Sequence, residues 1–285
     1  MNTIWIVMPI LIVLMFLLGV DINKKAFTDI ARNPKAVLLG MFGQLVILPI
    51  LAFTIAGILK LPPVYFMGLV LVACCPGGSS SNVFSMLAKG DIALSVTLTA
   101  ISSIITLFTL PVIMEFVTRT VSYFSGVELE LPVGKLLVQN IVLLLVPLFA
   151  GNLFKNFFPE AAVKVRKILG KMAFPALMLL AAVFFLQYKK EIYDNFASLG
   201  LSAAMLIFCA MACSSFMSRI GRFSDTVRRT IVIEVGMQNA AQAITIASSP
   251  FIFNSGEMAL PAICYALLMN VILLIYVYFI RRKQE

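Results

Sequence analysis

The sequence contains little charge and no histidine. Asp, Glu, Lys and Arg together make up 12% of its 285 residues, whereas a soluble domain carries about a quarter. So few charges cannot cover the surface of a water-soluble body of this size, which excludes a soluble protein. The absence of histidine excludes imidazole-based metal sites and proton relays.

Cysteine is also scarce. All five cysteines lie within apolar segments, and none has the paired, loop-borne spacing of a disulfide framework or a zinc site. We interpret them as small buried hydrophobic side chains. Hydrophobic residues, by contrast, make up 61% of the chain, which predicts an all-α, multi-pass integral membrane protein.

The apolar runs predict nine transmembrane helices, because a helix needs roughly 20 mostly apolar residues to cross a bilayer. The first run lacks a preceding basic residue and a cleavage site, so we interpret it as a retained helix rather than a signal peptide. Short connections predict antiparallel neighbours within a single transmembrane domain over residues 1–285, without an intervening soluble domain. The expected spans are 4–21, 36–59, 64–88, 91–117, 133–154, 168–188, 196–217, 228–249 and 258–280.

The distribution of Lys and Arg predicts the orientation in the membrane. Seventeen of the 22 Lys and Arg residues flank one side of the predicted spans and five flank the other. By the positive-inside rule, the N-terminus lies outside the cell and the C-terminus in the cytoplasm, with the protein in the cell membrane. The net charge of +9 therefore indicates topology, and we expect no nucleic-acid partner.

Two polar interruptions break predicted spans 3 and 8, at residues 75–82 and 234–239. Unwound backbone at membrane depth is tolerated only within protein or beside a water-filled cavity. Paired broken helices indicate the substrate and ion site of a secondary transporter. Since the two broken spans cross in opposite directions, we expect an inverted repeat, with units at 1–120 and 160–285 and span 5 unpaired.

Glu234 is the acid that lies well inside a predicted span. A charge at that depth is costly and usually marks a functional site, and its partner is either a proton or a metal cation. The alternative is a protonated glutamate bonded to a neighbouring helix. The segments around the two breaks also hold hard oxygen donors, which suit Na⁺ as they suit other hard cations. These donors are Gln44, Ser81, Asn82, Ser95, Thr99, Gln238 and Asn239.

The first break also predicts an anion site. Pro76 removes a backbone donor, and Gly77 and Gly78 allow conformations that other residues avoid. A helix that restarts at residues 79–81 leaves unpaired N–H groups and a positive dipole end, which attract an anion. A cation bound nearby lowers the electrostatic cost of bringing that anion in.

The sequences CPGGSSSN (75–82) and EVGMQN (234–239) resemble the two signature segments of the bile acid:sodium symporter family. GDIALS (90–95), which opens the fourth span, extends the likeness, and it runs along nearly the whole chain. The resemblance implies a core domain and a panel domain, with the two discontinuous helices crossing in the core. The chain is similar to a nine-helix member that lacks the first helix of ten-helix relatives.

The resemblance also implies site residues at matching positions. One sodium ion would be held by Ser81, Asn82, Ser95, Thr99 and Glu234. A second would be held by Gln44, Glu234, Gln238 and the carbonyls of Val235 and Met237. Ser79, Ser80, Asn239 and Asn270 would lie near the substrate, and Met269 departs from the polar residue that some bacterial relatives carry there.

Together these features predict sodium-coupled import of a small organic anion by alternating access. A bile-acid-like, a pantoate-like and a 2-oxo acid substrate all fit. One alternative is a metalloid or arsenite efflux carrier, suggested by Cys74 and Cys75 beside the break. Another is a membrane sensor that binds the ligand without moving it. We expect no enzymatic activity, because no nucleophile or catalytic base accompanies Glu234, and no obligate protein partner.

Overall fold

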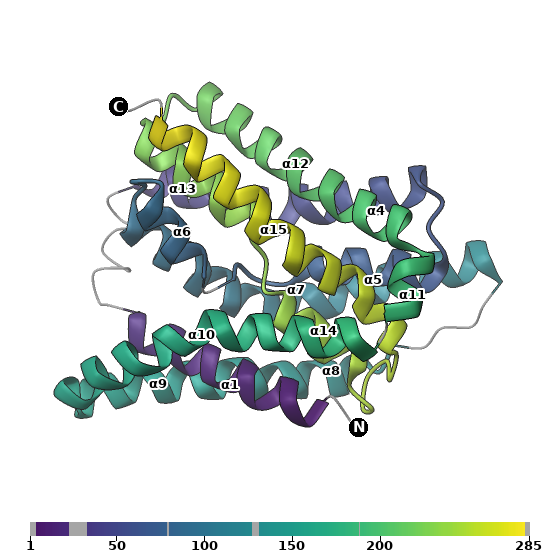
Figure 1. Cartoon of the computed structure of the whole chain (residues 1–285), viewed down its shortest axis with the longest axis horizontal. Helices are drawn as coiled ribbons and strands as arrows, with labels where there is room; N and C mark the ends of the chain where they lie inside the picture. Colours follow the sequence, from purple (N-terminus) through teal and green to yellow (C-terminus); the bar gives the residue numbers. More distant parts are fainter. Residues whose placement is uncertain (1–3, 23–32, 79, 127–130, 188, 283–285) are drawn as a thin grey trace.

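The computed structural model describes residues 4–22, 33–78, 80–126, 131–187 and 189–282, and the regular structure within them is helical, as predicted (Figure 1). A helix, or two helices with a short interruption, occupies each of the predicted ranges. The elements are α1 (Ile4–Asp21), α3 (Pro34–Phe42), the π-helix η1 (Gly43–Ile47), α4 (Leu48–Ile58), α5 (Pro63–Cys74), α6 (Ser81–Leu87), α7 (Ile92–Ser125), α8 (Val133–Asn140), the π-helix η2 (Ile141–Leu145), α9 (Val146–Phe157), α10 (Pro159–Gln187), α11 (Lys189–Asp194), α12 (Phe196–Ile220), α13 (Asp225–Gly236), α14 (Ala240–Ser248) and α15 (Gly256–Arg282).

The chain is an all-α multi-pass membrane protein. Within its described residues, five helical stretches are long and apolar enough to cross a membrane, and two shorter apolar helices accompany them. The long stretches are Pro34–Ile58, Ile92–Ser125, Val133–Phe157, Phe196–Ile220 and Gly256–Arg282.

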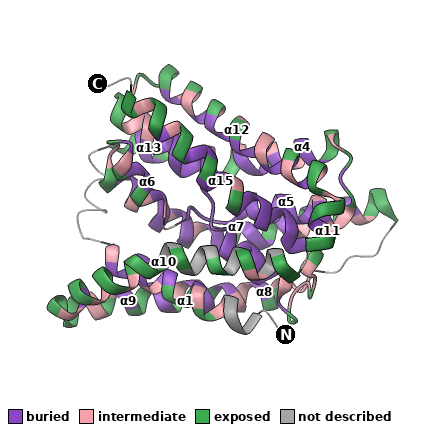
Figure 2. Cartoon of the chain, in the orientation of Figure 1, coloured by how far each residue is buried: buried purple, intermediate pink, exposed green. Residues whose placement is uncertain are grey.

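Helix α7 shows how the chain distributes polar and apolar side chains. Phe108, Val112 and Phe116 lie on its outer face and are each more than 60% exposed, whereas Thr99, Ser102 and other hydroxyl side chains of the same helix are fully buried. Figure 2 shows the wider pattern, with exposed residues along the outer helices and buried ones around the centre. Apolar residues outside and hydroxyls inside is the arrangement expected where the surrounding solvent is lipid.

The helices form two groups (Figure 1). Helices α1, α9 and α10 pack against one another, with α8 and η2 alongside, and the remaining long helices form the other group. Two glycines bring the backbones of α1 and α9 into contact. A Cβ added to Gly19 would lie 2.0 Å from the carbonyl oxygen of Leu148, and one added to Gly151 would lie 2.0 Å from that of Phe16. Small residues at such crossings are how membrane helices approach closely.

Both expected helix interruptions are present, and they pair with each other. α5 ends at Cys74 and α6 begins at Ser81, while α13 ends at Gly236 and α14 begins at Ala240. Between these ends, Gly77 and Gln238 form a single antiparallel bridge. The N–H of Gly78 donates to the carbonyl of Met237 at 3.0 Å, and that of Asn239 donates to the carbonyl of Pro76 at 2.8 Å. The two broken segments therefore satisfy part of each other's backbone, as membrane depth requires.

Two helix ends differ from the sequence prediction by clearly more than the few residues by which the other ends differ. α7 continues to Ser125 rather than ending near residue 117, and α10 begins at Pro159 rather than near residue 168. Hydropathy marks the depth of the bilayer, and a helix continues beyond that depth wherever its backbone hydrogen bonds continue. The cysteines agree with the prediction in being free, and Cys74, Cys75 and Cys264 are buried, while Cys209 and Cys213 are only partly so.

Candidate ion and substrate site

Glu234 lies at the crossing of the two broken helices and is fully buried. Its Oε1 accepts hydrogen bonds from the hydroxyls of Ser81, at 2.5 Å, and Ser95. Its Oε2 accepts from Thr99 Oγ1 at 2.9 Å. Among the residues that the structure describes, none forms an ion pair with Glu234. In the described part of the chain, the carboxylate is therefore held by neutral hydroxyl groups.

Helices α6, α7 and α13 bring this cluster together. Ser81 is the first residue of α6, and Ser95 and Thr99 lie one turn apart on α7, so they share a face. Asn82 joins the cluster because Ser95 Oγ also contacts its Oδ1 at 2.8 Å. All five residues expected at a first sodium site therefore lie in one cluster of oxygen atoms, in which Asn82 is half-buried and the other four are buried.

Gln44 approaches Glu234 from the π-helix η1 across Gly77. A Cβ added to Gly77 would lie 2.9 Å from Gln44 Nε2, 2.9 Å from Glu234 Oε2 and 3.5 Å from Thr99 Oγ1. Gln44 is 1% exposed, and neither its amide oxygen nor its nitrogen has a hydrogen-bond partner in the described chain. Buried polar groups are normally satisfied, so these atoms indicate a ligand position.

Gln238 and the neighbouring carbonyls complete the second expected set. Gln238 Nε2 donates to the carbonyl of Val235 at 3.0 Å, and its Oε1 has no partner among the described residues. The carbonyl of Met237 accepts the N–H of Gly78. Because a carbonyl oxygen has two lone pairs, the carbonyls of Val235 and Met237 each keep one for a further contact.

A cavity of about 530 Å³ adjoins the crossing. Ser80, Asn82 and Asn239 line it, and most of its other walls are apolar side chains from α1, α6, α7 and α15. Asn239 is 5% exposed. Its Oδ1 accepts the N–H of Gln242 at 3.1 Å, which caps α14, and its Nδ2 has no partner within the described ranges. This amide can therefore donate to an acceptor in the cavity.

The other residues expected near the substrate take different positions. Ser79 lies outside the described residues. Asn270 does not line the cavity, and its Nδ2 donates to the carbonyl of Ala266 in its own helix at 2.7 Å. Met269 lines the cavity instead. Cys74 and Cys75 are absent from the described lining, so the cavity gives the metalloid alternative no support.

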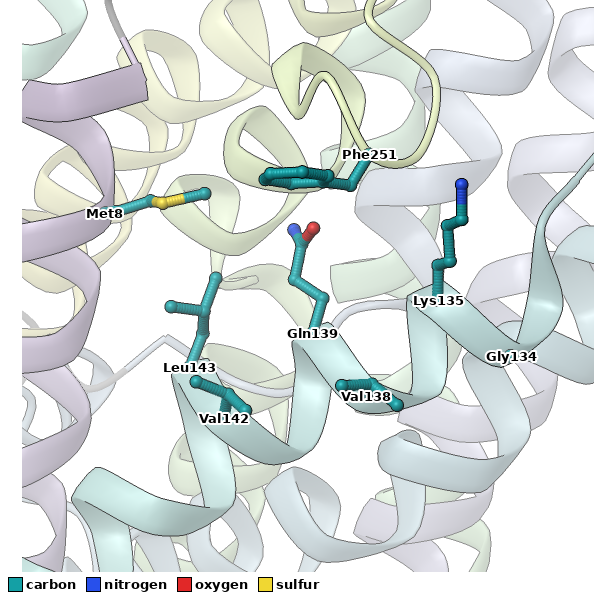
Figure 3. A pocket seen from close by; sticks show the side chains of 8 residues that line it. All are labelled: Met8, Gly134, Lys135, Val138, Gln139, Val142, Leu143 and Phe251. Atoms are coloured by element: carbon teal, nitrogen blue, oxygen red, sulfur yellow. The ribbon is translucent and has the colours of Figure 1, made fainter.

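A second cavity, of about 540 Å³, lies toward the start of α1 (Figure 3). It is lined by Met8, whereas the cavity beside the crossing is lined by residues 14–21 at the other end of α1. Figure 3 shows Gln139 of α8 pointing between Met8 and Lys135, below Phe251 of the connection from α14 to α15. In the same connection, Ser249 Oγ donates to Gln139 Oε1 at 2.7 Å. The two helix groups therefore meet at this end.

Several residues at the crossing were not identified from the sequence. Ser102 Oγ accepts the N–H of Gly77 at 3.2 Å, and the hydroxyl of Tyr265 donates to the carbonyl of Gly236 at 3.0 Å, so both fix the unwound backbone. Gln242 is 1% exposed and both its amide atoms lack a partner in the part of the chain described. Gln242 could have been identified as a site residue, because it is an amide inside a predicted span. Ser102 and Tyr265 offered no such signal, because serine and tyrosine are common in helices.

The chain is similar to known transporters. A family model described as "Sodium Bile acid symporter family" matches residues 8–195, more than half of the chain. A rice protein named "Probable sodium/metabolite cotransporter BASS2, chloroplastic" is 30% identical over 238 residues, which is 84% of this chain and 55% of the rice protein. The "Uncharacterized sodium-dependent transporter YocS" of Bacillus subtilis is 28% identical, over 84% of this chain and 72% of that protein. The rabbit "Ileal sodium/bile acid cotransporter" is 26% identical, over 85% of this chain and 69% of that protein.

Proposed function

Because the chain belongs to the sodium bile acid symporter family, we propose that it is a sodium-coupled symporter that imports a small organic anion by alternating access. The family is one of transporters and not of enzymes, in agreement with the sequence prediction. The proposal is made for a chain that spans only 55% of its rice relative. The names of these relatives connect them with sodium, metabolites and bile acid.

The observation that carries the proposal is the burial of Glu234 among hydroxyls, without a cationic side chain in ion-pair contact in the described chain. An ionised carboxylate at this depth costs several kcal/mol unless a cation accompanies it. Na⁺ offsets that cost, and hydroxyl, amide and carboxylate oxygens suit it. The proposed first ion contacts the cluster of Ser81, Asn82, Ser95, Thr99 and Glu234.

We assign a second sodium ion to Gln44, Glu234, Gln238 and the carbonyls of Val235 and Met237. The unpartnered amide oxygens of Gln44 and Gln238 support this assignment, because burying them without a partner is unfavourable. Glu234 then serves both ions. Since the ligands come from both broken helices, sodium binding orders the crossing, and the affinity for sodium and for the anion should rise together.

The anion is assigned to the cavity beside the crossing, where Ser80 and Asn239 form part of the wall. Ser79, which lies outside the described residues, and Asn270, which does not line this cavity, stay predicted substrate residues from the family resemblance. Support comes from Ser80 and from the unpartnered Nδ2 of Asn239, which is a donor at the cavity wall. The apolar walls fit the hydrocarbon part of an organic acid. A bile-acid-like, a pantoate-like and a 2-oxo acid all meet these requirements.

The two helix groups support a panel of α1, α8, η2, α9 and α10 and a core formed by the remaining long helices. In this proposal nine spans form two inverted units, residues 1–120 and 160–285, with the N-terminus outside the cell membrane. The cavity beside the crossing lies at the end where α1 meets the basic residues of α10, which the positive-inside rule assigns to the cytoplasm. Movement of core against panel would open the other end.

Flux into proteoliposomes tests the proposal. We expect an inward Na⁺ gradient to drive accumulation of labelled organic anions, and an equal K⁺ gradient to drive none. Binding of the anions with no accumulation would instead identify a membrane sensor. Accumulation that is equal with K⁺ would contradict sodium coupling.

Joining Gln139 to Ser249 should block transport. These residues make a 2.7 Å hydrogen bond between α8 and the α14–α15 connection, so a covalent link there prevents the proposed panel and core from separating at that end. The measurement is uptake by a Gln139→Cys, Ser249→Cys variant, in a background without the native cysteines, before and after a short bis-methanethiosulfonate reagent, which joins the two thiols through reducible disulfides.

Each single-cysteine variant, treated with the same reagent, is the control and should keep its uptake. Release of the link by reduction should restore transport in the double variant. Complete cross-linking with unchanged uptake would show that this end does not open during the transport cycle.

A further inference from the structure

One face of α10 forms a basic wall of the cavity beside the crossing. Arg166, Lys167, Gly170 and Lys171 all line it. Their spacing of one, four and five residues places them on one side of a helix. These basic residues contribute to the charge asymmetry that predicts the topology, and the proposed ion and anion sites do not include them.

The charges on this face are not balanced. Arg166 Nε lies 2.5 Å from Asp21 Oδ1 of α1, so this pair contributes no net charge to the cavity. Asp21 is itself part of the lining. In the described part of the chain, Lys167 and Lys171 take part in no ion pair. Within the described ranges, this wall of the cavity therefore carries two positive charges without an ion-pair partner.

The wall at the crossing is polar but uncharged. The Nδ2 atoms of Asn82 and Asn239 have no hydrogen-bond partner among the described residues, and both side chains line the cavity. The side chain of Asn239 is buried, with 5% of the residue exposed. Apolar side chains, including Leu14, Leu17 and Met269, contribute much of the remaining lining. The cavity thus combines amide donors at the crossing with an apolar lining and a pair of cations on α10.

From this arrangement we infer that the preferred substrate is an amphipathic dianion, with two acidic groups separated by a hydrocarbon body. One acidic group contacts the amide donors at the crossing. Lys167 and Lys171 bind the second, so this pair determines the preference for dianions over monoanions of the same length. The inference rests on the proposed function and names the substrate class of the same cavity.

The test compares suberate with octanoate, which share an eight-carbon chain and differ by one carboxylate. Sodium-dependent uptake of each is measured with wild-type protein and with the Lys167→Gln, Lys171→Gln variant. Exposed charge pairs are individually weak, so losing both cations should lower the apparent affinity for suberate by about tenfold, which corresponds to about 1.4 kcal/mol. Uptake of octanoate should stay unchanged. Raising the ionic strength should also reduce the wild-type preference for suberate, because exposed charges are screened.

Two control variants accompany the test. Lys164→Gln with Arg219→Gln also removes two positive charges from exposed helical positions, and neither residue lines the cavity. This control should keep the preference for suberate. The Lys167→Arg, Lys171→Arg variant retains both positive charges and should also keep the preference for suberate over octanoate.

The outcomes separate this inference from the proposed function. Sodium-dependent uptake of octanoate without any preference for suberate would overturn the dianion inference and leave sodium-coupled anion transport in place. A preference that survives in Lys167→Gln, Lys171→Gln would overturn the role of the basic pair. Absence of sodium-dependent uptake of suberate by wild-type protein would overturn the inference, whereas the proposed function fails only if no organic anion accumulates with sodium.

Discussion

Glu234→Gln is expected to abolish sodium-dependent uptake. Glutamine has nearly the same shape, and its carbonyl oxygen can still accept hydrogen bonds from Ser81 and Ser95. It lacks the negative charge that offsets the cost of taking Na⁺ out of water. Removing one partner of a buried charge pair typically costs about 3–5 kcal/mol, which corresponds to more than about a hundredfold in affinity.

The same substitution should leave the sodium-free protein folded. Glutamine removes a buried charge, so the apparent melting temperature without sodium should not fall much. Added sodium should raise the melting temperature of the wild type, because a ligand that binds the native state stabilises it, and it should not raise that of the variant. Glu115→Gln is the matched control, since Glu115 pairs with Arg119 at the surface of α7. Full sodium-dependent uptake by Glu234→Gln would show that its carboxylate is not an ion ligand.

Gly77→Ala is expected to be nearly as damaging, for reasons of space. The added methyl would lie 2.9 Å from both Gln44 Nε2 and Glu234 Oε2, closer than real Cβ contacts, so both side chains must move apart. Gly77 does not have a positive φ, so alanine is compatible with its backbone. The steric clash therefore falls on the proposed ion site, and we expect sodium-dependent uptake to fall by about five- to 150-fold, since overpacking costs about 1–3 kcal/mol.

Gly57→Ala provides the control for Gly77→Ala. It makes the same change in α4, where an added Cβ would meet no atom within 4 Å. Its uptake and sodium response should equal those of the wild type. A Gly77→Ala variant with normal sodium affinity would mean that the space between Gln44 and Glu234 is not where the ion binds.

The sequence predicted the helix breaks and the central residue because both depend on local chemistry. Pro76 lacks a backbone donor, and Gly77 and Gly78 disfavour a helix, so the three together weaken an apolar helix at this point. Glu234 is too costly to bury without a function. Ser95 and Thr99 could be placed on one face of α7 from their spacing alone. Contact between these groups and Glu234 follows from the crossing of the broken helices, which the family resemblance implied and local propensity does not specify.

The remaining features could not be predicted because they leave hydropathy unchanged. The π-helix that carries Gln44 differs from an α-helix in its backbone hydrogen bonding, and hydropathy does not report that difference. A proline follows both π-helices, at Pro49 and Pro147. Because proline has no backbone N–H to donate, these two residues were the available sequence signal for a change in helical hydrogen bonding. The basic wall of α10 requires knowing which helix faces the cavity, and that depends on the packing of α10 against α1.

Equilibrium binding of radioactive sodium to the purified protein in lipid nanodiscs tests the central claim most directly. Wild-type protein and the Glu115→Gln variant should bind sodium saturably, with little displacement by excess K⁺, and Glu234→Gln should bind none above background. Equal sodium binding by Glu234→Gln and the wild type would contradict the assignment of this carboxylate to the ion site.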